Sequence, residues 1–445
     1  MQQGGSVNSN DRFFFPQGIV YMPFEGDVVV VSITTANWIV LKSEFQQTLL
    51  HCLVDGASVG EVYSLVKSED HFEEFRQLLA AITARDFARI DHEPVIELLE
   101  GYKMLNCYLT NACNLRCEHC FMQSGVKLKE ELSPAEWIRV LTEFHNAGGE
   151  SVTFSGGEPL MNKAFPEIVK YANEIGLNVT VLSNGILWSQ DMIEKLSPYI
   201  TEIQISIDGV DEESNSIVRG KGHFDKVTDT VVAFANKGVR TSVATTFTLR
   251  NLHDNTGERY KQMVEDIKSR SVNPVFFKLS KKVLQGRNTH YSEEENRLFY
   301  NQIMEIEKCV DENAQFNNFM EGHTPNLLAR NCGFGGISIG ADGEVYFCNR
   351  ISEVESYGNV KGKPLDAFMK LGHDLHLATS VDNLSPCKDC PLRYICSGGC
   401  RIDECNFEGK LKAFEGDLIQ VKCTEKYKER LLRKMVESYN FYYSF

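Results

Sequence analysis

The chain has 445 residues, enough for roughly three domains of about 150 residues each. Its 42% hydrophobic and 24% charged residues are typical of a globular protein, and its net charge of −15 argues against a nucleic-acid partner, whose phosphates are bound through Lys and Arg. The sequence has neither a run of about 18 apolar residues nor a recognisable signal segment, so we expect a cytoplasmic protein without a membrane partner. Its 14 cysteines then indicate metal binding rather than disulfides.

Residues 13–96 predict a small domain of three strands followed by three helices. Turn formers such as Glu25-Gly26 separate the strand-like runs, and Ser58 can cap the second helix. This is the order of a winged-helix domain, many of which bind DNA, but the third helix opens with four acidic residues, a poor surface for phosphates. The expected elements are strands at Gly18–Met22, Asp27–Ile33 and Trp38–Val40, helices at Ser43–Val54, after Ser58 and at His71–Asp86, and a wing strand at Phe87–Ile90.

Residues 100–300 alternate strand and helix patterns, which predicts an α/β fold with a parallel sheet, here a partial barrel of six β/α units similar to a TIM barrel. A helix is expected at Ser133–Ala147, opened by the capping-box pair Ser133 and Glu136. Functional residues should follow the carboxyl ends of the strands. The strands are expected at Met104–Leu109, Ser151–Phe154, Asn178–Leu182, Glu202–Ile207, Thr241–Phe247 and Pro274–Leu279.

Three cysteines, Cys113, Cys117 and Cys120, follow the first of these strands. Thiolates suit iron–sulfur clusters and zinc, and a 4Fe–4S cluster takes four ligands. Three cysteines in one loop therefore leave one iron open to a substrate or cofactor. The alternatives are a zinc site with His119 as fourth ligand, or reduced structural thiols.

Polar and glycine residues follow the later strands. Two glycines let the backbone approach a ligand closely, a carboxylate accepts hydrogen bonds from an ammonium group, and side chains two apart on a strand point the same way. These residues are Gly156, Gly157, Glu158 and Pro159 after the second strand, Ser183 after the third, Ser206 and Asp208 at the fourth, and Arg219 beyond it.

A second set of seven cysteines lies between residues 331 and 430, an expected loop-rich domain that a bridging region (301–330) connects to the barrel. Seven cysteines exceed the four of one zinc site, and their spacing is not that of a zinc ribbon. We assign no role to the tail at 431–445. The cysteines are Cys332, Cys348, Cys387, Cys390, Cys396, Cys400 and Cys423.

The cysteine loop with the Gly-Gly-Glu-Pro segment resembles the radical S-adenosylmethionine (SAM) enzymes. The resemblance implies a 4Fe–4S cluster at the three loop cysteines, with the amino and carboxylate groups of SAM on the open iron. It also implies that residues 156–159 bind the amino group of SAM, that Ser183, Ser206 and Asp208 contact its ribose, that Arg219 reaches its carboxylate or a neighbouring acid, and that the ring of His119 packs near adenine.

Nearly the whole chain, from about Gly18 to Cys423, resembles ribosomal-peptide maturases of this class. The C-terminal cysteines resemble the SPASM domain, which implies two auxiliary 4Fe–4S clusters. The residues before the barrel resemble a pyrroloquinoline-quinone chaperone-like (PqqD-like) element, in which a leader peptide adds a strand beside the third helix. The implied ligands are Cys332, Cys348 and Cys400 for auxiliary cluster I, which is open or completed by Cys405 or Cys309, and Cys387, Cys390, Cys396 and Cys423 for auxiliary cluster II.

These resemblances predict a maturase that uses a 5′-deoxyadenosyl radical to form an intramolecular carbon–carbon, ether or thioether cross-link in a precursor peptide. Three 4Fe–4S clusters, SAM and an electron donor such as flavodoxin or ferredoxin are implied. The alternatives are a formylglycine-generating enzyme of the anaerobic sulfatase-maturing type and, from another class, an iron–sulfur redox sensor that binds DNA. We assign no catalytic base.

Overall fold

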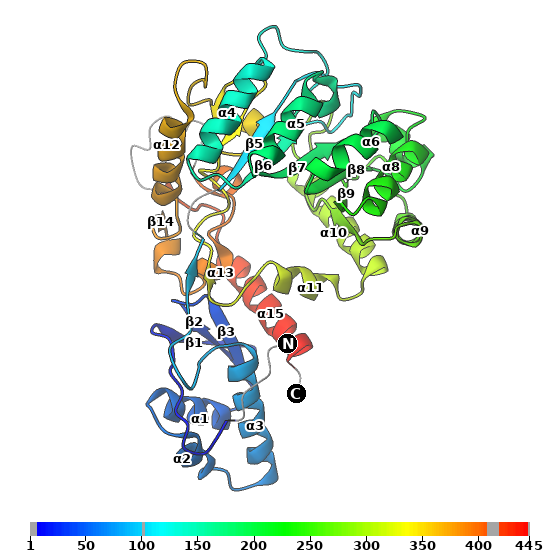
Figure 1. Cartoon of the computed structure of the whole chain (residues 1–445). Coiled ribbons are helices and arrows are strands. Elements are labelled where there is room, and N and C mark those ends of the chain that lie inside the picture. Colours follow the sequence, from blue (N-terminus) through cyan, green and yellow to red (C-terminus); the bar gives the residue numbers. More distant parts are fainter. Residues whose placement is uncertain (1–6, 100–102, 407–417, 444–445) are drawn as a thin grey trace.

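The computed structural model describes residues 7–99, 103–406 and 418–443. An N-terminal sheet with its helices lies at one end of an elongated molecule and a large α/β sheet at the other, and helix α15 (Glu425–Tyr442) extends towards the N-terminal end (Figure 1). Parts of the expected barrel domain (100–102), iron–sulfur domain (407–417) and tail (444–445) fall outside the described residues. Within the described part, no helix has the length and apolar character needed to cross a membrane.

The N-terminal region has the predicted order, with an antiparallel sheet β1-β2-β3 followed by three helices. Ser58 and Glu61 form the capping box of the second helix, and the third begins two residues before its predicted start, after the cap Ser68. Residues 87–90 form only one bridge, from Arg89 to Phe14, because Phe87 and its neighbour turn into the core, so the wing-strand prediction is wrong. The elements are β1 (Ile19–Phe24), β2 (Asp27–Ser32), β3 (Asn37–Leu41), α1 (Glu44–Val54), α2 (Val59–Tyr63) and α3 (Glu69–Ala84).

Helix α15 completes the core of this N-terminal region. Every residue of β3, and every residue of β2 after Asp27, is buried, so both faces of the sheet are covered. Leu432, Met435 and Val436 of α15 belong to the same core as these strands and α1–α3. The helix runs through the expected boundary at residues 430 and 431, and the tail therefore packs against the N-terminal sheet.

Met435→Ala is expected to destabilise the N-terminal region locally by about 2–5 kcal/mol, since Met435 is fully buried and its removal leaves a cavity. Amide hydrogen exchange of β2 and β3 should become faster, while exchange in the distant large sheet should not change. Glu437→Ala, at an exposed position of the same helix, is the control. Unchanged exchange in Met435→Ala would contradict the shared core.

The barrel region is an α/β fold with all six predicted strands, paired in parallel in the order β10-β9-β8-β7-β6-β5. The predicted capping box of Ser133 and Glu136 opens α4. The bounds are β5 (Met104–Tyr108), β6 (Ser151–Ser155), β7 (Asn178–Ser183), β8 (Glu202–Ser206), β9 (Arg240–Thr245), β10 (Val275–Leu279), α4 (Pro134–Asn146), α5 (Phe165–Glu174), α6 (Gln190–Leu196), α7 (Glu212–Arg219), α8 (Phe224–Asn236) and α9 (Thr256–Arg270).

The C-terminal region extends the same sheet. Strand β12 pairs in parallel with β5 and in antiparallel with β13, which gives eight strands, mostly parallel. The region that carries the second set of cysteines thus shares a sheet with β5, the strand that precedes the cysteine loop. The remaining elements are β4 (Glu97–Leu98), α10 (Glu293–Val310), α11 (Ala314–Glu321), β11 (Leu327–Leu328), β12 (Ser338–Ile339), β13 (Val345–Tyr346), α12 (Leu365–Ala378), β14 (Leu384–Ser385), α13 (Arg393–Cys396), α14 (Arg401–Glu404) and β15 (Leu418–Ile419).

Candidate functional site

The cysteine loop lies just beyond the carboxyl end of β5. Cys113, Cys117 and Cys120 are partly buried and form no disulfide. Burial raises the pKa of Cys113 to about 11, and the nearby negative charges of Glu158 and the other two thiols add to the shift. The amide of Leu115 points at the Cys113 sulfur, at 3.4 Å. The three thiols therefore form one group, and a bound metal would have to displace their protons.

The Gly-Gly-Glu-Pro segment is hydrogen-bonded to the start of this loop. The amides of Gly157 and Glu158 donate to the carbonyls of Thr110 and Ala112, at 2.7 and 2.9 Å. A Cβ atom at Gly156 would collide with the first of these carbonyls, and one at Gly157 with the second. Only glycine permits this approach, and it brings Glu158 to the cysteines. Pro159 is buried and starts a single 3₁₀ turn (Pro159–Met161).

Glu158 is fully buried and held by hydrogen bonds from the next strand end. Its carboxylate accepts from the Asn184 amide and the Ser183 hydroxyl, both at 2.8 Å. Burial raises the pKa of Glu158 to about 7, although these hydrogen bonds oppose the rise. The Ser183 oxygen also accepts from the Gly185 amide and the indole of Trp188. In this structure Ser183, predicted to contact ribose, orients Glu158.

Asp208, Arg219 and His119 form a buried charged cluster next to the cysteine loop. Arg219 Nε donates to Asp208 Oδ2 at 2.5 Å, and His119 Nε2 lies 3.2 Å from the same oxygen. The other carboxylate oxygen accepts from the Thr246 amide at 2.7 Å. Both oxygens of Asp208 are thus engaged within the protein, and Asp208 positions Arg219 and His119. Ser206 ends β8 and is half-buried.

The charges of this cluster act on the cysteines. Burial would lower the pKa of Arg219, but the Asp208 carboxylate and the Cys117 thiol more than offset that effect and raise it. Burial lowers the pKa of His119, which favours the uncharged ring. Its Nδ1 atom is buried and has no hydrogen-bond partner among the described residues. Thiols, a carboxylate, a guanidinium and this ring nitrogen therefore surround the carboxyl ends of β5, β6 and β8, a donor set that suits an iron–sulfur cluster and a zwitterionic ligand.

A second cysteine group comprises Cys332, Cys348 and Cys400. Burial raises the pKa of Cys348 to about 11, and the nearby thiols of the other two contribute to the rise. Arg350 connects the group, because its amide lies 3.4 Å from the Cys348 sulfur and its guanidinium 3.5 Å from the Cys400 sulfur. Asp403 pairs with Arg350. Arg350 was not predicted from the sequence, although its position two residues after Cys348 is a detectable signal.

The third group comprises Cys387, Cys390, Cys396 and Cys423, all of which line one cavity of about 390 Å³. Burial raises the pKa of Cys387 to about 12, and the three other thiols add to the shift. Met22 of β1 and Tyr427 of α15 line the same cavity, and the Tyr427 hydroxyl lies 3.4 Å from the Cys396 sulfur. One cavity is therefore lined by four thiols together with residues of β1 and α15.

A site for a single metal ion has different geometry. Among residues 7–99, 103–406 and 418–443, no three His, Cys, Asp or Glu side chains come close enough to hold one ion. His119, the fourth ligand in the zinc alternative, is turned to Asp208 instead.

Comparison with known proteins identifies the region around this site. Residues 107–267 match the family model described as the Radical SAM superfamily, which spans the sheet from β5 to α9 and includes the cysteine loop, Glu158 and Arg219. The "Sporulation killing factor maturation protein SkfB" of Bacillus subtilis (strain 168) is 29% identical over 240 residues, 52% of this chain and 56% of that protein. This chain thus spans just over half the length of that relative.

A second relative matches a larger share of this chain. The "Fe-coproporphyrin III synthase" of Methanosarcina barkeri (strain Fusaro / DSM 804) is 28% identical over 338 aligned positions, which cover 66% of this chain and 82% of that protein. Among solved structures, Streptococcus suis SuiB bound to precursor peptide SuiA aligns with a TM-score of 0.50 at 15% identity, over 88% of this chain and 96% of that chain. At that identity the structural match supports a shared fold and nothing further.

Proposed function

We propose that this chain, a radical SAM superfamily enzyme, modifies a ribosomally made precursor peptide by forming an intramolecular cross-link. The observation that carries the proposal is that Glu158 and Arg219 lie close enough to the cysteine loop for their charges to act on Cys113 and Cys117. The same chain also has an N-terminal sheet and two further cysteine groups. The names of SkfB, a maturation protein, and of SuiB with its precursor peptide support a peptide as substrate.

In this proposal Cys113, Cys117 and Cys120 hold a 4Fe–4S cluster and leave one iron for SAM. When bound, the cluster and SAM supply the electron and the 5′-deoxyadenosyl radical that removes a substrate hydrogen. Glu158 and the Gly156–Gly157 backbone would hold the SAM ammonium. Arg219 would hold the SAM carboxylate, Ser206 the ribose and the His119 ring the adenine. Ser183 and Asp208 hold Glu158 and Arg219 in place.

The two C-terminal groups are proposed to hold auxiliary 4Fe–4S clusters, one at Cys332, Cys348 and Cys400 and one at the four cysteines of the 390 Å³ cavity. Forming a cross-link with loss of two hydrogens requires a second electron to leave the substrate, and clusters held by these cysteines would supply an acceptor. The positive charge of Arg350, whose amide and guanidinium lie near the Cys348 and Cys400 sulfurs, would favour the reduced state of a cluster held there. A flavodoxin or ferredoxin is the proposed donor for the cysteine loop.

The N-terminal sheet is the proposed binding site for the leader peptide, through addition of a strand. The edge beside α3 is β3, which is already covered. Arg85 donates to the carbonyl of Trp38 at 3.2 Å, and the Tyr439 hydroxyl faces the amide of Val40. A cavity of about 280 Å³ lies between this edge, α3 and the end of α15. Pairing at β3 would require the end of α15 to move, whereas the edge of β1 has no neighbouring strand among the described residues.

The test is co-expression with a candidate precursor peptide encoded beside this chain. Mass spectrometry should find the peptide lighter by two hydrogens, and the purified protein should form 5′-deoxyadenosine from SAM under reducing conditions. Reductive SAM cleavage without any modified peptide would retain the radical SAM assignment and reject a peptide as substrate. No cleavage at all would reject both.

Formation of iron coproporphyrin III is a second candidate, favoured by the larger share of the chain covered in the comparison with its synthase. Incubation with an iron tetrapyrrole precursor of iron coproporphyrin III under the same conditions separates the two candidates, since only one of the two products, the cross-linked peptide or iron coproporphyrin III, should form.

Glu158→Gln is expected to weaken SAM binding roughly 10- to 150-fold, because a charge-assisted hydrogen bond contributes about 1.5–3 kcal/mol. Since burial raises the pKa of Glu158 to about 7, SAM affinity of the unmodified protein should fall as pH decreases below about 7, where SAM must displace the carboxyl proton. The Gln variant should show no such dependence. Isothermal titration of the reconstituted protein measures both effects, with Glu167→Gln, an exposed position on α5, as control. Equal affinity for SAM in Glu158→Gln and Glu167→Gln would mean that Glu158 does not bind SAM.

A further inference from the structure

The group of Cys332, Cys348 and Cys400 supplies three thiolates, one fewer than the usual ligand set of a 4Fe–4S cluster. Two cysteines outside both groups, Cys309 and Cys405, are candidates for the fourth. The structure places them in very different surroundings.

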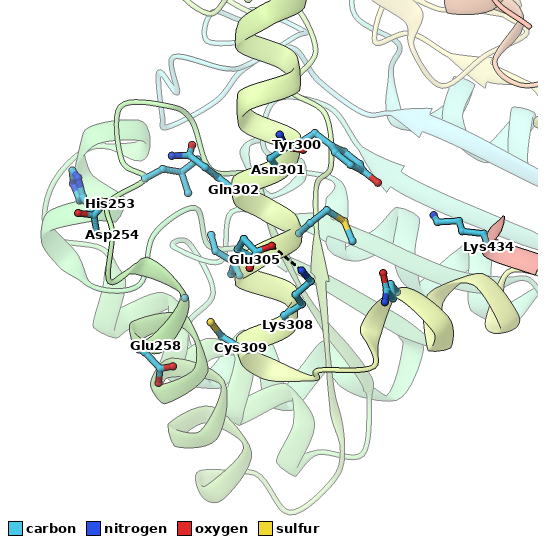
Figure 2. Close-up of a pocket in the computed structure, with 15 residues that line it drawn as sticks. His253, Asp254, Glu258, Tyr300, Asn301, Gln302, Glu305, Lys308, Cys309 and Lys434 are labelled. Atoms are coloured by element: carbon cyan, nitrogen blue, oxygen red, sulfur yellow. Dashed lines mark hydrogen bonds and ion pairs between the residues drawn. The ribbon is translucent and has the colours of Figure 1, made fainter. Parts of the chain in front are cut away.

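Cys309 lies in the outer helical layer. It is near the end of α10, and its sulfur would be 2.6 Å from a Cβ atom placed on Gly257 of α9. It lines an open cavity of about 890 Å³ together with Glu258, Glu305 and Lys308 (Figure 2). This cavity contains none of the other cysteines, and the thiol of Cys309 packs where two helices cross.

Cys405 lies next to the incomplete group. Cys400 and Cys405 are the N-cap and C-cap of the four-residue helix α14, so one helical turn separates them. The Glu404 amide donates to the Cys400 carbonyl at 3.0 Å, which closes this turn. Burial raises the pKa of Cys405 to about 11, and the thiols of Cys332 and Cys400 are close enough to add to the shift.

The backbone around Cys405 is fixed from both sides. Residue 405 bridges Gln420, and the Val421 amide donates to the Glu404 carbonyl at 2.8 Å. The buried Arg401 guanidinium anchors the helix on the carbonyls of Thr379, Ser397 and Gly399. The thiol therefore has a defined position beside the group.

The competing interpretation is a small buried thiol, because Cys405 belongs to a small core with Val381, Leu384, Leu418 and Cys387, a cysteine of the other group. That packing accounts for its burial. It does not account for a third cysteine next to Cys332 and Cys400, on the same turn as one of them.

We propose that Cys405 is the fourth protein ligand of the cluster held by Cys332, Cys348 and Cys400. The proposal rests on the proposed function in one respect, that this group holds a cluster. With four thiolates the cluster is closed, and the substrate is not bound through one of its irons. The cluster then exchanges electrons only, in agreement with the proposed role as an electron acceptor.

The test uses the full chain carrying Cys113→Ala, Cys117→Ala and Cys120→Ala, which leaves only the two C-terminal clusters, about eight irons per chain after anaerobic reconstitution. Adding Cys405→Ala should lower iron and sulfide towards about four per chain, or leave one iron that binds an added small thiol and changes the EPR spectrum of the reduced protein. Cys309→Ala should match the parent in both readouts.

Cys405→Ser covers the case in which the alanine variant fails to fold. Serine is nearly the same size and can ligate through oxygen, so iron is retained while the EPR spectrum shifts. An EPR spectrum and iron content equal to the parent in Cys405→Ser would overturn the proposal, as would their loss in Cys309→Ala alone. A parent that binds only about four irons, all lost with Cys390→Ala, would show instead that Cys332, Cys348 and Cys400 hold no cluster.

Discussion

Replacing Cys113 with alanine is expected to reduce SAM cleavage to the level of a reaction without enzyme. The charge of Glu158 contributes to the raised pKa of Cys113, so the loss of this thiol removes a cluster ligand near the group proposed to hold the SAM ammonium. Two remaining cysteines do not hold a 4Fe–4S cluster firmly, and the protein should lose up to about four irons. Chromatography of 5′-deoxyadenosine after reduction with dithionite measures the effect.

The matched control is Cys107→Ala, which removes a thiol six positions earlier. Cys107 is fully buried in β5, and burial alone raises its pKa, as expected of a thiol in an apolar core. This variant should bind iron and cleave SAM as the parent does. If Cys113→Ala formed 5′-deoxyadenosine at the parent's rate, the loop would not be the site of SAM cleavage, whatever the other two cysteine groups do.

The sequence was sufficient to predict the parts of the fold that depend on local patterns. All six parallel strands lie within a few residues of their predicted bounds, because a buried strand is a continuous apolar run that ends at turn residues. The cap at Ser58 and the capping box of Ser133 and Glu136 were equally visible, since each depends on a few side chains at the start of one helix. The positions of Glu158 and Arg219 after strand ends follow from the same alternation.

Contacts between distant segments could not be predicted in this way. Strand β12 is two residues long and pairs with β5 more than 200 positions earlier in the chain, so neither its composition nor its periodicity indicates the pairing. Helix α15 was not predicted, and nothing in its own sequence indicates that its partner is the N-terminal sheet.

The roles of Ser183 and Asp208 illustrate the same limit at the site. Their positions at strand ends predicted contact with a ligand, and the structure places both side chains among the residues of the candidate site. Each is nevertheless engaged with a neighbouring protein group, Glu158 for the serine and Arg219 for the aspartate, because a buried carboxylate or guanidinium requires hydrogen-bond partners. The contacts of Ser183 and Asp208 with ribose therefore stay predictions, because a strand-end position indicates which residues gather at a site but not which groups each of them bonds.

Replacing Cys390 with alanine is expected to have the opposite pattern to the loss of Cys113: SAM is still cleaved, but the modified peptide is not formed. Cys390 lines the 390 Å³ cavity beside Met22 and Tyr427, a site built from the C-terminal region, β1 and α15. None of those elements contributes to the loop at β5 or to the hydrogen bonds of Glu158, so the SAM site should remain intact. Without an acceptor for the second electron, the substrate radical would instead take up one electron from the reductant in the assay and one proton from water, and so return to unmodified peptide.

The measurement is a paired assay on one sample, with 5′-deoxyadenosine by chromatography and the peptide product by mass spectrometry. The parent should form both. Cys390→Ala should retain SAM cleavage within a few-fold and lower the peptide product to background, while Cys309→Ala, at a thiol between α9 and α10, should retain both. Retained cleavage also shows that the variant is folded at its SAM site, so loss of product cannot be attributed to global unfolding. A Cys390→Ala protein that cross-links the peptide at the parent's rate would mean that electrons leave the substrate by a route that does not include this cysteine group.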